Sequence, residues 1–234
     1  MGRPIGCYGA PLAFPHSGGE GYGAPQMAGE KEATQEELAN EVRELSARCE
    51  QHVRDAVGLP LDGTADTLPI LDHYVRLSIE ASARRPELLP LLARTVGAYF
   101  GQVVADHLGG FWWLPSGDIY TWHVCLRSVF LAFNPIGMAH SALTWSLGPE
   151  LSADGPSAQL RLEGKHRDAI ELRLAALPPL RESDFFTLSS RLEGLEIAAA
   201  ALGEEMVLAG IGDRVYDDDD YSEELAGLTA PALH

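Results

Sequence analysis

The side chains best suited to nucleophilic or acid–base chemistry lie in the middle of the chain. His123 and Cys125 stand two residues apart in a run that favours a β-strand, so both are expected on the same side of a sheet. A cysteine beside a histidine is the arrangement of a thiol nucleophile and its base. Together with Asp118, these residues are the candidates for an enzymatic site assembled around the sheet. We favour the commoner alternative, a core cysteine beside a half-buried histidine.

Metal ligation has one candidate pair, Cys49 and His52. They are three residues apart on a predicted helix, share one face and could give two ligands to zinc. A structural zinc site usually closes with a second pair, and the sequence has no other Cys-x-x-Cys or Cys-x-x-His. Phosphate-binding glycine loops and dinucleotide fingerprints are also absent from it. We therefore expect neither a metal nor a cofactor.

Three of the four tryptophans fall within eleven residues, at Trp112, Trp113 and Trp122. The structural interpretation is a hairpin that packs its aromatic side on helices, because aromatic residues favour strands. However, Trp112 and Trp113 are adjacent and must face opposite sides of a strand. One of them could therefore anchor a partner, and we include all three tryptophans among the candidate partner-binding residues.

An acidic run lies near the C-terminal end: Asp217, Asp218, Asp219 and Asp220, followed by Glu223 and Glu224. It is not an EF-hand loop, because the position that requires glycine is Ser222 and the twelfth position holds no glutamate. We interpret it as a solvated acidic segment that could attract a basic partner by electrostatic steering. The four aspartates complete the candidate partner-binding set.

Helical periodicity dominates the first half of the chain. Thr34 and Glu37 form a capping-box pattern before a helix that ends near Gly58, and two further helices are expected over 69–85 and 86–107. Asp72, on the second of these, is interpreted as a polar surface residue. Gly101 costs the third helix about 1 kcal/mol relative to alanine, so we expect another element to approach it closely.

After Gly110 the periodicity becomes that of strands. Runs at 111–114, 120–126 and 129–133 predict two or three strands, and Asn134-Pro135 marks the possible start of a short helix. Alternation around 164–167 suggests a hairpin of 160–162 with 170–174, with a helix from Asp168 as the alternative. A helix returns after Ser183 and ends at Gly210. The order predicts an α+β fold, in which an N-terminal helical layer packs on one face of an antiparallel sheet, with a late C-terminal helix.

Composition limits the class of protein. The 234 residues carry 34 acidic and 17 basic side chains, a net charge of −17, which argues against nucleic-acid and anionic-membrane surfaces. No apolar run approaches the roughly 18–20 residues of a membrane span. Three widely spaced cysteines form no disulfide framework, so a cytoplasmic location is the default. Residues 1–33 are interpreted as a flexible segment, because the first thirty positions hold eight glycines and four prolines. Residues 34–228 are predicted to form one domain, and residues 229–234 a tail.

Several segments resemble a pattern of uncharacterised small bacterial α+β proteins, similar in size to immunity proteins. The matching residues are Ala98-Tyr99-Phe100-Gly101-Gln102, Leu108-Gly109-Gly110-Phe111-Trp112, Asn134-Pro135, Ser189-Ser190-Arg191-Leu192-Glu193 and Asp220-Tyr221. The resemblance covers about residues 68–228. It implies a helix with a central glycine that leads into a Trp-bearing strand, and a closing helix with an acidic end. It carries over no catalytic residue.

The leading hypothesis is a non-enzymatic acidic protein that engages a basic protein partner, of the immunity or adaptor type. An enzyme with a site at the sheet is the first alternative. A regulatory or structural subunit that attaches through its N-terminal segment is the second.

Overall fold

The computed structural model describes residues 33–148, 155–163, 166–167, 170–171, 173 and 181–229. All of them belong to the unit formed by residues 32–234. The predicted flexible segment 1–33 and the predicted tail 229–234 fall almost wholly outside the described residues, as does most of the loop expected over 148–157.

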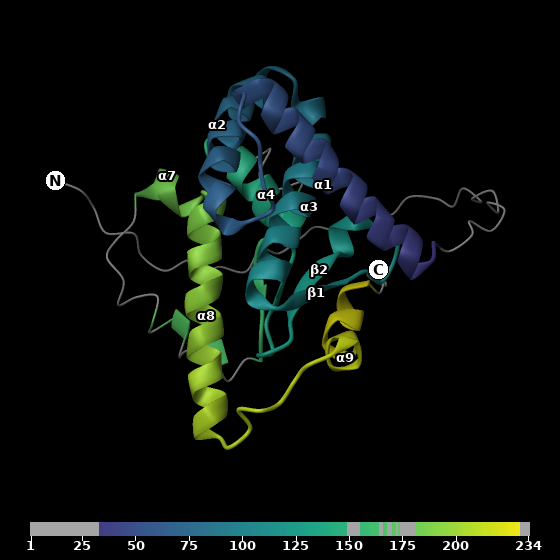
Figure 1. The fold of residues 1–234 in the computed structure, drawn as a ribbon, viewed down its shortest axis with the longest axis vertical. Coiled ribbons are helices and arrows are strands. Elements are labelled where there is room, and N and C mark those ends of the chain that lie inside the picture. The colour runs from purple at the N-terminus through teal and green to yellow at the C-terminus, as the bar shows by residue number, and fades with distance from the viewer. Residues whose placement is uncertain are drawn as a thin grey trace, which may run out of the picture. The chain divides into compact units, whose positions relative to one another are not determined.

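The predicted helical layer is present, and α3 lies at its centre, packed against α1 and α4 (Figure 1). Thr34 and Glu37 form the predicted capping box at the start of α1, and Gly58 and Gly109 end α1 and α3 in the left-handed region. The elements of the layer are α1 (Gln35–Val57), α2 (Leu68–Arg84), α3 (Leu89–Leu108) and α4 (Pro135–Thr144).

Two glycines on one face of α3 allow α4 to approach closely. A Cβ built at Gly101 would lie 2.5 Å from the ring of Trp112 and 2.9 Å from Pro135, which confirms the expected close packing. One turn earlier, a Cβ at Gly97 would lie 2.6 Å from the Cα of Ile136. The backbone of α4 therefore begins where α3 has no side chains.

The sheet is antiparallel, in the order β1-β2-β3-β4. Its strands are shorter than predicted, because Ile119–Thr121 forms a 3-10 turn in place of the first part of the expected second strand. Asp118 accepts a hydrogen bond from the backbone N–H of Tyr120, which favours this turn over an extended chain. The strands are β1 (Gly110–Trp113), β2 (His123–Leu126), β3 (Ala132–Phe133) and β4 (Leu160–Arg161).

Helices cover both faces of the sheet rather than one. Trp112 points toward α3, where its ring lies against Gly101 and its indole N–H donates to the side-chain Oε1 of Gln102 at 3.3 Å. Its neighbours Phe111 and Trp113 face the opposite side and meet α9 (Asp218–Thr229). The acidic segment, for which the sequence predicted a solvated surface but no helix, forms the first turns of α9 with most of its carboxylates exposed.

The second half of the chain also departs from the predicted hairpin. Residues 160–161 form β4, which pairs with β3, whereas residues 170, 171 and 173 are helical. The alternative of a helix in this region is therefore the one observed. The predicted late helix is present as α7 (Glu182–Phe185) and α8 (Leu188–Leu208), which ends before Gly210.

Among the described residues, one helix, Pro86–Leu108, is long and apolar enough to cross a membrane by length and composition, with a mean hydropathy of 1.3. This helix contains no uninterrupted apolar run of that length in the sequence, because polar residues are distributed along the segment. Two-thirds of its apolar window (67%) is buried inside the molecule. A core helix has the same composition, and α3 packs at the centre of this core.

Candidate functional site

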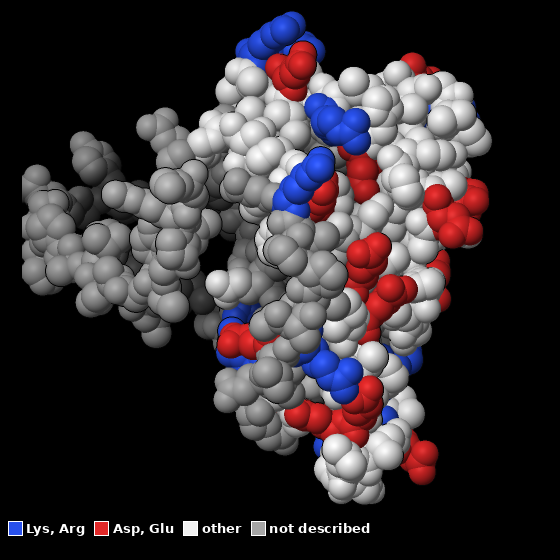
Figure 2. Space-filling view, turned by 90° about the vertical axis from the view of Figure 1, so that its left-hand side faces the viewer, with Lys and Arg blue, Asp and Glu red and all other residues white. Residues whose placement is uncertain are grey.

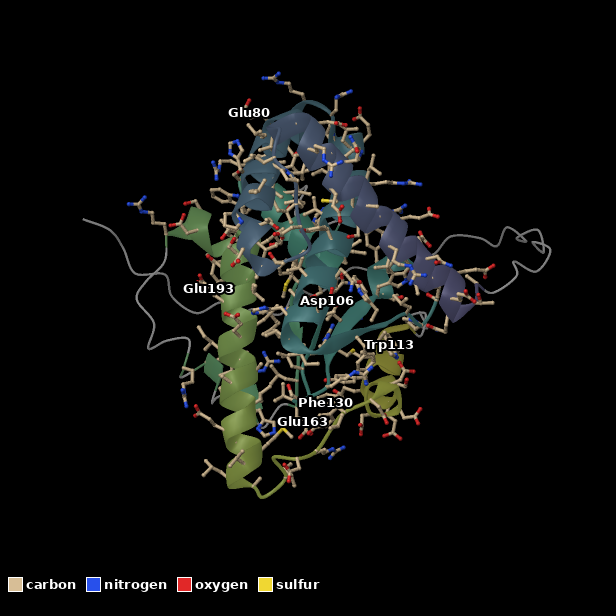
Figure 3. The ribbon with its side chains drawn as sticks, viewed as in Figure 1. Glu80, Asp106, Trp113, Phe130, Glu163 and Glu193 are labelled. Carbon is tan, nitrogen blue, oxygen red and sulfur yellow. The ribbon has the colours of Figure 1, made fainter. Side chains whose placement is uncertain are left out.

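The acidic run borders a groove between α9 and the sheet, with a volume of about 420 Å³. Carboxylates form its rim and aromatic rings form part of its wall. Figure 3 shows Phe130 and Glu163 at this end of the sheet, with Trp113 beside α9. The groove is lined by Phe130, Glu163, Arg214, Tyr216, Asp219, Asp220, Glu223 and Glu224, and we call it the acidic groove.

Two of the four predicted aspartates stabilise the start of α9. The Asp217 carboxylate accepts from the backbone N–H groups of Asp219 and Asp220, at 3.1 and 3.4 Å. In return, Asp220 accepts from the backbone N–H of Asp217 at 3.1 Å. This is the reciprocal arrangement of a capping box, and the helix dipole favours acidic residues in the first turn. Asp217 and Asp220 thus have a structural role.

The remaining carboxylates are free to contact other molecules. Asp218, Asp219, Glu223 and Glu224 are exposed. Among the residues that the structure describes, none of these four carboxylates has a hydrogen-bond or ion-pair partner. Asp219, Glu223 and Glu224 line the acidic groove, and Asp218 adds its charge to the same turn.

Arg214 already occupies part of the acidic groove. Its guanidinium carbon lies 4.5 Å from the centre of the Tyr216 ring, and one nitrogen donates to Asp220 at 2.9 Å. The pKa of the Asp220 carboxyl is lowered from its usual value, chiefly by the hydrogen bond from the Asp217 backbone and then by Arg214. The groove therefore holds a guanidinium group between an aromatic face and a carboxylate.

The aromatic wall is fixed to the sheet by Tyr221. Its ring stacks on Phe130 with the centroids 4.6 Å apart, and Phe130 meets the edge of Tyr216 at 5.5 Å. The Tyr221 hydroxyl accepts from the backbone N–H of Leu131 and donates to the Leu126 carbonyl at 2.7 Å. Burial raises the pKa of this hydroxyl, so it stays protonated and keeps the donor.

The tryptophans occupy three different environments. Trp122 is fully buried and donates to the Ser116 carbonyl at 2.8 Å. Trp113 is buried and donates to the Ser222 hydroxyl of α9 at 3.2 Å. Both side chains are used inside the protein, so we leave them out of the proposed binding surface. Trp112 is half-buried.

Trp112 lines a second groove, about 460 Å³ in volume, between α1 and α3. Its other residues are Ala39, Val42, Arg43, Ser46, Ala47, Glu50 and Gln102. The indole is held by the bond to Gln102 and by an edge contact with Trp122, at 6.5 Å between ring centres. Of the three predicted tryptophans, this one remains accessible to a partner.

Of the three candidates for an enzymatic site, His123 and Cys125 are buried in β2 and Asp118 is exposed in a turn. The fully buried Cys125 has a raised pKa, chiefly through desolvation, so the nucleophilic thiolate is disfavoured. His123 bonds the Thr121 carbonyl through Nδ1 at 2.7 Å, and burial lowers its pKa. Because a carbonyl only accepts, Nδ1 carries the proton. Asp118 caps the 3-10 turn.

Cys49 is also fully buried, and desolvation raises the pKa of its thiol. His52 is half-buried on the same helix. Within the described parts of the chain, no three His, Cys, Asp or Glu side chains are grouped to hold a metal ion.

The interpretation of Asp72 as a surface residue is wrong. Its side chain is buried, and its carboxylate accepts from the backbone N–H groups of Leu188 and Ser189 and from the Ser189 hydroxyl. It thus caps α8 from a helix that lies 116 residues earlier. Burial raises the pKa of this carboxyl despite those three bonds.

Sequence reasoning also missed the aromatic wall and Arg214. Arg214 and Tyr216 directly precede the acidic run, and this cation–aromatic–acid succession was the available signal. The part played by Phe130 depends on a tertiary contact and has no local signal.

Charge is mixed on the face that Figure 2 displays. There, acidic and basic side chains are both spread over the surface rather than gathered into a single acidic patch. The net charge of −17 therefore does not by itself define a binding surface. The acidic groove is distinguished by its own contacts.

Comparisons with protein families, with curated proteins and with solved structures give no match to this chain.

Proposed function

We propose that this protein binds a basic protein partner through the acidic groove and performs its role by binding rather than by catalysis. The observation that carries the proposal is Arg214, which lies over Tyr216 and is bonded to Asp220 inside the groove. An arginine of a partner would find the same combination of an aromatic face and carboxylates.

Three exposed carboxylates, which have no partner among the described residues, provide the remaining charge. Asp219, Glu223 and Glu224 line the groove beyond Arg214, so an incoming cation would not have to break an existing ion pair to reach them. Opposite charge across an interface speeds association and selects the partner. An inhibitor of a basic toxin, as in immunity proteins, or an adaptor in the cytoplasm would use such a surface.

The proposal is tested with a fluorescein-labelled peptide of alternating arginine and glycine, followed by fluorescence anisotropy. The full chain should bind it, and binding should weaken steeply as salt rises from about 50 to about 300 mM. A peptide of alternating glutamate and glycine should not bind. We expect the triple variant Asp219→Asn, Glu223→Gln, Glu224→Gln to bind the arginine peptide about tenfold more weakly.

A matched variant separates the groove from net charge. Glu41, Glu44 and Asp55 are exposed on α1, and their neutralisation by Glu41→Gln, Glu44→Gln and Asp55→Asn removes the same three charges elsewhere. This variant should bind nearly as the wild type does. If both triple variants lose affinity equally, attraction is due to overall charge, and the groove is not the binding site.

A substitution of Arg214 should strengthen binding of the arginine peptide rather than weaken it. Arg214 competes with an incoming cation for Tyr216 and Asp220, so Arg214→Ala should tighten binding of the arginine peptide by about threefold. Weaker binding by this variant would show that the groove needs Arg214 in place, which contradicts the proposed mode of recognition.

A further inference from the structure

Two adjoining cavities lie between α4, residues 155–160 and the start of α8. The larger, about 650 Å³, has polar residues in its wall, among them Ser141, Ser157 and Gln159. The smaller, about 200 Å³, is mostly apolar and is lined by Met138, Phe185, Leu195 and Ile197, with others. Ala158, Leu160 and Arg191 belong to both walls.

Arg191 has a positive charge at the junction of these cavities, and no anionic side chain of the described segments pairs with it. Its guanidinium carbon lies 4.5 Å from the ring centre of Phe185 and 5.5 Å from that of Phe186. Its Nε is buried and has no hydrogen-bond partner in the part of the chain that the structure describes. Within the described residues, no carboxylate lies at ion-pair distance from it. Burial lowers its pKa, but an arginine stays charged at neutral pH because its usual pKa is so high.

This arrangement is unusual in a chain with twice as many acidic as basic residues. A half-buried charge is costly unless it is paired, and the two phenylalanine rings provide only part of the stabilisation. Glu193 lines the smaller cavity but makes no ion pair with Arg191, and Figure 3 shows it on the outer side of α8. Among the residues that the structure describes, no carboxylate occupies the pairing position of Arg191, which leaves it open to a bound anion.

We propose that the paired cavities bind a small organic carboxylate. Its apolar body occupies the smaller cavity, and its carboxylate accepts hydrogen bonds from Arg191. The apolar wall favours an organic molecule over inorganic phosphate. Arg191 is the only Lys or Arg among the described residues that line the two cavities, which favours a single negative charge over a multiply charged phosphate ester. This site is distinct from the acidic groove and does not depend on the function proposed for it.

The probe for the test is 3-phenylpropionate, a monoanion with an apolar body, measured by isothermal titration calorimetry on the full chain. We expect saturable binding, and we expect the neutral analogue 3-phenylpropionamide to bind at least about tenfold more weakly. Inorganic phosphate should bind more weakly than the carboxylate. Equal binding of the acid and the amide would overturn the proposal, as would phosphate binding as tightly as the acid.

Two variants locate the site. Arg191→Gln should lose at least about tenfold in affinity for 3-phenylpropionate, whereas Arg127→Gln should bind normally. Arg127 is the matched control, because it also lies over an aromatic ring, at 4.5 Å from the centre of Phe111, but it is exposed and outside the cavities. Unchanged binding by Arg191→Gln would overturn the assignment.

Gly194→Leu keeps the test decisive if Arg191→Gln does not fold. Gly194 lines the smaller cavity in α8, and a Cβ there would meet no atom within 4 Å. Leucine also has a higher helix propensity than glycine, so the variant should fold. It should fill the apolar space and abolish binding while Arg191 stays in place. A folded Gly194→Leu protein that binds 3-phenylpropionate with full affinity would contradict the proposed site.

Discussion

At the scale of single residues, burial decides what His123 and Cys125 can do. Their spacing places both residues on one side of β2, as predicted from the sequence. That side faces α9, because their partners in β1, Trp113 and Phe111, contact this helix. Trp113 meets the imidazole edge-on at 6.0 Å, and the His123 side chain is buried. Desolvation then disfavours both the imidazolium and the thiolate. The same pair of residue types would be reactive only where water or a cation stabilised their charged forms.

His123 should make stability depend on pH. Its pKa is lowered in the folded protein below the ordinary value of 6.5, so the unfolded chain binds more protons as the solution becomes acidic. The contribution of neutral His123 is complete above about pH 6.5 and is lost as pH falls through the folded pKa. Chemical denaturation should therefore show a larger loss of unfolding free energy between about pH 7.5 and about pH 5 in the wild type than in His123→Gln.

His73 provides the control for this measurement. It is exposed on α2, so His73→Gln should keep the pH dependence of the wild type. If His123→Gln also keeps it, the acid sensitivity has another origin.

At the scale of elements, the contact between α3 and α4 depends on missing side chains. Gly97 and Gly101 are one helical turn apart and face the beginning of α4. Glycine lowers helix propensity, so α3 gives up intrinsic stability at these positions. The close packing with Pro135, Ile136 and Trp112 offsets that loss.

Gly97→Ala should therefore destabilise the protein although alanine is the better helix former. The added Cβ would meet backbone atoms of Ile136, which cannot rotate away, so we expect the free energy of unfolding to fall by about 2–3 kcal/mol. Gly203→Ala in α8 is the matched control, because a Cβ there meets nothing within 4 Å. It should raise the free energy of unfolding by up to about 1 kcal/mol. Thermal and urea denaturation measure both, and a gain in stability from Gly97→Ala would contradict the packing described.

At the scale of the whole molecule, single polar side chains connect segments that are distant in sequence. Asp72 joins α2 to the start of α8, and Tyr221 joins α9 to the backbone around β2 and β3. Both side chains are buried, and each forms hydrogen bonds with backbone groups of the distant segment. The position of the acidic groove depends on the second connection, because Tyr221 holds α9 against Phe130.

Loss of the Asp72 carboxylate should loosen the start of α8. Asp72→Ala leaves the backbone N–H groups of Leu188 and Ser189 without their acceptor, so we expect the free energy of unfolding to fall by about 1–2 kcal/mol. Hydrogen exchange at these two amides should become faster. Asp66→Ala, at an exposed position, should change stability by no more than a few tenths of a kcal/mol. Unchanged exchange in Asp72→Ala would show that α8 is not capped from α2.

Local patterns predicted the fold class and most of the helices. The capping box at Thr34, the stripes of apolar residues in α1 and α3, and the glycines that end these helices are all short-range signals. The strands were predicted less well, because the 3-10 turn at Ile119–Thr121 interrupts a run of β-favouring residues. No helix was predicted for the acidic run, because the capping hydrogen bonds between Asp217 and Asp220 were not recognised among its charges.

By itself, the sequence determined the composition, the net charge, the helical periodicity and the need for close packing at Gly101, since each of these depends on residue type and on neighbours within a few turns. Only the tertiary structure decided that Trp122 is inside the protein and Trp112 accessible, that Asp72 caps a distant helix, and that Arg191 has no anionic partner among the described residues. Exposure and pairing depend on which segments meet across the fold. Those contacts are set by side chains as far apart as Asp72 and Leu188, and no local pattern contains both.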